Sequence, residues 1–173
     1  MLRLRRMTSF AAFLGAVVVS AGIAQAADIG GTISSPLTIT ENSQLVDDVT
    51  CTVTGAACIA IGAPNVTLQL NGFTITGLAD PKTACAGGGT GTEHGISVTG
   101  QTNVTIDGPG LVQQFRGGGV FLNNTTRNKV IGVTVSTNCF SGIWVTGPNS
   151  AENELYDNIS VRNGNAVSPC GGI

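Results

Sequence analysis

Three versions of one pattern decide the fold: GISVTGQTNVTI (95–106), GVFLNNTTRNKVI (119–131) and GIWVTGPNSAENEL (142–155). The first aliphatic residue of each copy recurs at spacings of 24 and 23 residues, and one Asn recurs at spacings of 25 and 25: Ile96, Val120 and Ile143; Asn103, Asn128 and Asn153. Alternating aliphatic residues that repeat at this period are typical of a β-solenoid, in which each repeat adds one coil to a stack. The sequence therefore predicts an all-β fold of stacked coils.

The composition agrees with this prediction. Of 173 residues, 10% are charged and 5% aromatic, and 25 are Gly. Low charge and few aromatic residues favour a stack of small β-branched residues over an ordinary globule with one large core.

The first 26 residues have the features of a secretory signal peptide. Arg3, Arg5 and Arg6 precede an apolar run over residues 10–24, and Ala24-Gln25-Ala26 fits the small-x-small cleavage pattern. Cleavage there would leave 5 basic against 10 acidic residues, so no basic stripe for nucleic acid remains, and no later segment predicts a membrane span. We expect a secreted, periplasmic or cell-surface protein.

All five cysteines follow the predicted signal peptide, and an oxidising compartment favours disulfides. Cys51 and Cys58 are close enough in sequence to staple the first coil. Cys139 and Cys170 precede successive Gly-Ile starts, so we expect them to be stacked neighbours within disulfide reach. Cys85 has no assigned role. Zinc is the competing interpretation of these thiols, but the chain has a single His and no C-x-x-C pair.

The rest of the chain divides into an N-terminal cap of strands over residues 27–57 and the β-helix over residues 58–173. Residues 79–94 interrupt the period and predict an inserted loop on one face of the stack. Val133-Thr134-Val135 and Ile159-Ser160-Val161 lie in nearly the same place of two coils, with a register slip of about a residue, as a bulge produces. Asn residues crowd the corners, where stacked amides form hydrogen-bond ladders. Because residues 170–173 start another coil, we expect an N-terminal fragment of a longer protein, or an end covered by a partner.

Several motifs resemble the right-handed parallel β-helix proteins of the pectin-lyase-like superfamily. They are NVTLQLNGFTITG (65–77), NVTIDG (103–108) and the G-[IV]-x-[VL] starts at 95, 119 and 142. The resemblance implies a single-stranded, right-handed parallel β-helix of about five coils. It also implies a polysaccharide lyase, a glycoside hydrolase, an epimerase or a relative without chemistry, because this fold does not fix one function.

The residues needed for those reactions are incomplete. Inverting hydrolysis requires an acid and a base carboxylate on either side of a sugar, and the family motifs for it are largely missing. No stack of acidic residues predicts a calcium site, and no cofactor or metal is expected. Glu93 and His94, where the inserted loop rejoins the stack, are the remaining acid–base candidates, and packing of His94 on the solenoid wall is the alternative.

The clearest ligand signal lies on the outer wall. If Ile96, Val120 and Ile143 point inward, alternation places Ser97, Phe121 and Trp144 outward in one column, with Asn123 and Thr146 in a polar column beside them. Adjacent aromatic rings form a flat platform that suits the apolar faces of sugars.

We therefore expect an exported protein that binds polysaccharide or helps to process it. The first alternative is a structural or adhesion solenoid without ligand chemistry, which associates end to end through its C-terminal coil. The second is the N-terminal part of an enzyme whose active residues lie beyond Ile173.

Overall fold

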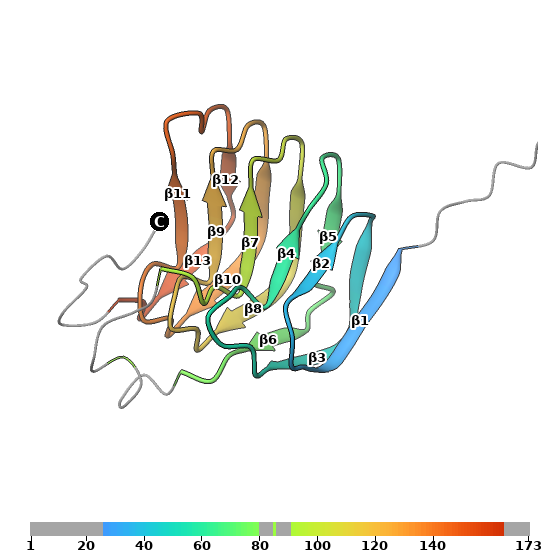
Figure 1. Cartoon of the computed structure of the whole chain (residues 1–173), viewed down its shortest axis with the longest axis vertical. Helices are drawn as coiled ribbons and strands as arrows, with labels where there is room; N and C mark the ends of the chain where they lie inside the picture. Colours follow the sequence, from blue (N-terminus) through green and yellow to red (C-terminus); the bar gives the residue numbers. More distant parts are fainter. Residues whose placement is uncertain (1–25, 80–84, 86–90, 165–173) are drawn as a thin grey trace, which may run out of the picture.

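The computed structural model describes residues 26–79, 85 and 91–164, and every regular element in this part of the chain is a β-strand. Five strands form one sheet, in the order β11-β9-β7-β4-β2, and Figure 1 shows them side by side. Their bounds are β2 Leu37–Ile39, β4 Ile59–Ile61, β7 Ile96–Thr99, β9 Val120–Asn123 and β11 Ile143–Thr146.

The other sheet has eight strands along the path β1-β3-β5-β8-β10-β12, with β6 pairing to β3 and β8 and β13 pairing to β10. Their bounds are β1 Ala27–Ile33, β3 Ser43–Cys51, β5 Thr67–Gln69, β6 Thr74–Thr76, β8 Thr105–Gln113, β10 Lys129–Ser136, β12 Glu154–Tyr156 and β13 Ile159–Val161. Every strand pairing is parallel, and successive segments of the chain alternate between the two sheets. The prediction of an all-β fold with parallel stacking is confirmed, and the arrangement is compatible with a β-solenoid.

The predicted columns are also confirmed by the strand register. Ile96 pairs with Val120, which pairs with Ile143, and all three side chains are buried. One residue later in each strand, Ser97 pairs with Phe121 and Phe121 pairs with Trp144, and these residues form the outward column. Because alternate residues of a strand face opposite sides of the sheet, one register fixes both the aliphatic core and the outer surface.

The register of the last described repeat turns two aliphatic side chains outward. β13 pairs with β10 so that Thr134 lies beside Ile159 and Val135 lies beside Ser160. Ser160 therefore takes the inward place next to buried Val135, and Ile159 and Val161 are 56% and 41% exposed. The expected slip of one residue between these two segments is present.

Asparagine side chains link neighbouring repeats, as the ladder prediction requires. The Oδ1 atom of Asn128 accepts the Val104 N–H at 2.7 Å, and Oδ1 of Asn153 accepts the Asn128 N–H at 3.1 Å. Asn138 and Asn163 repeat this arrangement at a second corner. These bonds satisfy backbone donors just before or just after a strand, and they fix the distance between repeats.

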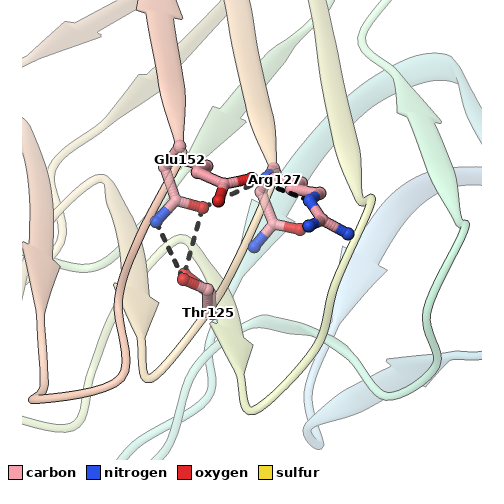
Figure 2. Close-up of polar contacts among 5 residues, drawn as sticks. Thr125, Arg127 and Glu152 are labelled. Atoms are coloured by element: carbon pink, nitrogen blue, oxygen red, sulfur yellow. Dashed lines mark hydrogen bonds and ion pairs between the residues drawn. The ribbon is translucent and has the colours of Figure 1, made fainter.

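Charged side chains continue the same corner on the outside. Arg127 Nε donates to Glu152 Oε2 at 2.7 Å, and Figure 2 shows this pair beside Thr125. Two residues further along the chain, Lys129 Nζ lies 2.9 Å from Glu154 Oε2. Both pairs are exposed to solvent, so each contributes little to stability.

The two disulfides agree with one prediction and correct the other. Cys51 is bonded to Cys58, as expected. Cys139 is bonded to Cys85, so the predicted pairing of Cys139 with Cys170 is wrong. Cys85 belongs to the 79–94 insertion and is buried with Ala79 against Cys139, which ties the insertion to the stack. Cys170 lies outside the described residues, as do the predicted signal peptide up to residue 25 and the C-terminal coil start at 170–173.

The predicted cap is continuous with the rest of the sheets. Residues 27–57 contain β1, β2 and β3, and β2 and β3 pair in parallel with strands of the following repeat. Within the described residues, no helix is long and apolar enough to cross a membrane.

Candidate carbohydrate-binding surface

Four ring-bearing side chains gather on the outer face of β9 and β11, and we call them the aromatic cluster: His94, Phe121, Phe140 and Trp144. Strand pairing places Phe121 and Trp144 side by side, both partly exposed, with ring centroids 4.9 Å apart. Their planes are inclined by 59°, so the expected flat platform is wrong. Parallel strands lie about 4.8 Å apart, and two bulky rings at that spacing relieve crowding by tilting.

Phe140 was not among the residues singled out from the sequence. Its ring lies 4.8 Å from that of Trp144, with 36° between the planes. It precedes β11 at the corner where the earlier repeats have Gly117 and Glu93, so no periodic pattern marks it. The rings of Phe140 and Trp144 are therefore more nearly parallel than those of Phe121 and Trp144.

His94 covers one face of Phe121. The two ring centroids are 4.2 Å apart with planes inclined by 8°, and His94 also meets the edge of Trp144 at 6.2 Å. The insertion thus sends its last residues back over the column, and Phe121 lies between the rings of His94 and Trp144. The triple glycine allows this approach, because a Cβ at Gly117 would lie 2.7 Å from His94 Nδ1.

Both ring nitrogens of His94 are engaged by the backbone. The Gly118 N–H donates to Nδ1 at 2.9 Å, so Nδ1 is unprotonated and Nε2 carries the hydrogen that it donates to the Gly91 carbonyl at 3.0 Å. Burial lowers the pKa of His94, because removal from water disfavours the imidazolium. This geometry gives the ring a packing role, and an acid–base role for Glu93 and His94 stays a prediction.

Glu93 turns away from the aromatic cluster into a different environment. Its Oε1 accepts the Gly55 N–H at 2.8 Å and lies 3.6 Å from Arg116 Nη1. The Arg116 Nε is buried, and no described residue accepts a hydrogen bond from it. Glu93 and Arg116 line a cavity of about 390 Å³ whose other walls include Val53, Leu78 and Phe115. The cavity combines apolar walls with the polar side chains of Thr54, Glu93 and Arg116.

The predicted polar column lies next to the rings. Thr99 pairs with Asn123 and Asn123 with Thr146, and all three side chains are at least partly exposed. They follow Ser97, Phe121 and Trp144 by two residues, so they face the same side. The structure therefore brings together all four predicted ligand-binding residues, Phe121, Trp144, Asn123 and Thr146, on one surface.

An aromatic ring beside hydroxyl and amide groups can bind a molecule that has an apolar face and a polar edge. Among the described residues, no group of three or more His, Cys, Asp or Glu side chains is placed to hold a metal ion. No protein-family model, curated protein or solved structure compared with the chain matches it.

Proposed function

We propose that the protein is an exported β-helix protein that binds polysaccharide through the surface around Trp144. The observation that carries this proposal is the Trp144–Phe140 pair, 4.8 Å apart, beside the polar column of Asn123 and Thr146. Pyranose rings present apolar C–H faces and hydroxyl edges, so the rings and the column match the two parts of a sugar.

The architecture that we propose with this function is a right-handed, single-stranded β-helix of about five coils, related to the pectin-lyase-like superfamily. The parallel two-sheet stack and the motifs at 65–77 and 103–108 support it. The signal-like residues 1–26 and the two disulfides support export to an oxidising compartment.

Affinity electrophoresis through gels that contain polysaccharide tests the binding function. Wild-type protein should be retarded, and Trp144→Ala should weaken the retardation by about tenfold or more, since aromatic side chains at binding sites dominate affinity. Tyr156→Ala is the matched control, because Tyr156 is a 43% exposed aromatic residue of β12, which belongs to the other sheet. Equal retardation of wild type and Trp144→Ala, with circular dichroism unchanged, would refute the proposal.

A structural role is the second candidate, and the exposed aliphatic residues favour it. Val145 in β11, the outermost of the described strands in its sheet, is 38% exposed, and Ile159 and Val161 face outward in β13. Edge strands with apolar side chains pair readily with other chains. If the protein self-associates through this end, light scattering will give a mass that rises with concentration, and Ile159→Lys will reduce it. A constant monomer mass would exclude this second candidate.

A further inference from the structure

We propose that the surface around Trp144 takes an uncharged polysaccharide, a chain of pyranose rings whose hydroxyls are mostly equatorial. This inference rests on the proposed function and names the ligand class for the same surface. Such a ring has apolar C–H groups on both faces and all its hydroxyls at the rim. It therefore stacks on an indole while its edge reaches hydrogen-bonding groups.

The first argument is the lack of charge along the outward columns of the five-stranded sheet. The column that contains Trp144 runs through uncharged residues in all five strands: Thr38, Ala60, Ser97, Phe121 and Trp144. The neighbouring column contributes Thr99, Asn123 and Thr146. Hydroxyl and amide groups hydrogen-bond sugar hydroxyls without requiring an ionic partner.

The second argument is that the charged residues before and after the central strand β9 are already paired. Before it, Arg116 faces Glu93, and after it, Arg127 is bonded to Glu152 at 2.7 Å. Both basic side chains therefore lie opposite a carboxylate, although the buried Arg116 Nε has no acceptor among the described residues. The formal net charge of the chain is -2, so its overall field also repels a polyanion.

The size of the outward side chains gives the third argument. Towards β4 and β2, the column passes from the large rings of Phe121 and Trp144 to the small side chains of Ser97, Ala60 and Thr38, all outward by register. Because His94 covers one face of Phe121, the rings assigned to a sugar are those of Trp144 and Phe140. A carboxylate on every ring of a polymer would have to be accommodated beside these uncharged side chains without a cation.

Two polymers that share one backbone separate charge from stacking. Hydroxyethyl cellulose is neutral and carboxymethyl cellulose carries carboxylates, and mixed-linkage β-glucan, glucomannan and polygalacturonate extend the comparison. We expect retardation by at least one neutral polymer, and at least tenfold weaker retardation by carboxymethyl cellulose than by hydroxyethyl cellulose at low salt. The difference should shrink as added salt screens the charges.

Substitution of exposed Thr99 provides a matched pair of variants. Thr99→Lys should gain retardation by carboxymethyl cellulose, and Thr99→Glu should lose it further. Trp144→Phe, which keeps an aromatic ring, replaces Trp144→Ala if the latter unfolds.

The outcomes distinguish this inference from the function on which it rests. If acidic polymers are retained more strongly than neutral ones, in a manner that depends on Trp144, the neutral class is wrong and polysaccharide binding stands. If no polymer is retained, both fail. If a neutral polymer is retained and Trp144→Ala and Tyr156→Ala weaken binding equally, the assigned surface is wrong.

Discussion

Replacement of Asn138 by Ala tests how the repeats are held together. Asn138 is 1% exposed and makes three side-chain hydrogen bonds. Its Oδ1 accepts the Phe115 N–H at 3.0 Å, and its Nδ2 donates to the Val112 carbonyl at 3.3 Å and to Asn163 Oδ1 at 3.0 Å. The side chain thus connects three consecutive repeats through one amide.

The expected cost follows from what the substitution leaves behind. A buried N–H without an acceptor, here that of Phe115, costs about 1–3 kcal/mol, and the two lost donor bonds add about 0.5–1.5 kcal/mol each. We therefore expect Asn138→Ala to lower the free energy of unfolding by about 2–6 kcal/mol. Domains of this size have about 5–15 kcal/mol in total, so the loss is large but measurable.

Urea denaturation followed by circular dichroism provides the measurement, with an unchanged m-value as the check that both proteins unfold alike. Asn149→Ala is the control, because Asn149 is exposed and its side chain makes no hydrogen bond to a described residue. It should change stability by less than about 0.5 kcal/mol. If Asn138→Ala matches this control, the amide ladder contributes nothing and the reasoning is refuted.

Three further results are expected. Ile96→Ala should lower the free energy of unfolding, measured by urea denaturation, by about 2–5 kcal/mol, because Ile96 is fully buried. Ile159→Ala, on the exposed side of β13, should lower it by less than about 0.5 kcal/mol. Equal losses in the two variants would contradict the inward position of Ile96. His94, the single histidine, has a lowered pKa in the folded state, so the unfolded chain takes up its proton first, and stability should be complete above about pH 6.5 and fall below it. A melting temperature that varies equally with pH between 5 and 8 in wild type and His94→Leu would exclude this. The double variant Cys85→Ser, Cys139→Ser should lose about 2–4 kcal/mol while its five-stranded sheet is retained; unchanged stability would show that the bond constrains little.

The core and the outer columns could be predicted because both depend on periodicity. Ile96, Val120 and Ile143 recur at nearly one spacing, and parallel pairing in register then places Phe121 beside Trp144. Because side chains alternate between the two faces of a strand, the sequence alone placed all four ligand-binding candidates on one face of the sheet.

The rest of the site lies outside that periodicity. The 79–94 insertion has no counterpart in the other repeats, so neither the Cys85–Cys139 bond nor the stacking of His94 on Phe121 follows from spacing. Phe140 occupies the position that Gly117 and Glu93 occupy in earlier repeats, so the repeat pattern does not predict an aromatic residue there. The tilt between Phe121 and Trp144 depends on side-chain packing, which alternation does not specify.

Trp144 is the single tryptophan of the chain, so its fluorescence reports directly on the surface to which we assign ligand binding. Excitation at a wavelength that only indole absorbs, during titration with the polymer that retards the protein most, measures occupancy of this surface alone. We predict a saturable change in emission, with reduced quenching by acrylamide in the bound state. Emission and quenching that stay constant while the same polymer still retards the protein would contradict the proposed site.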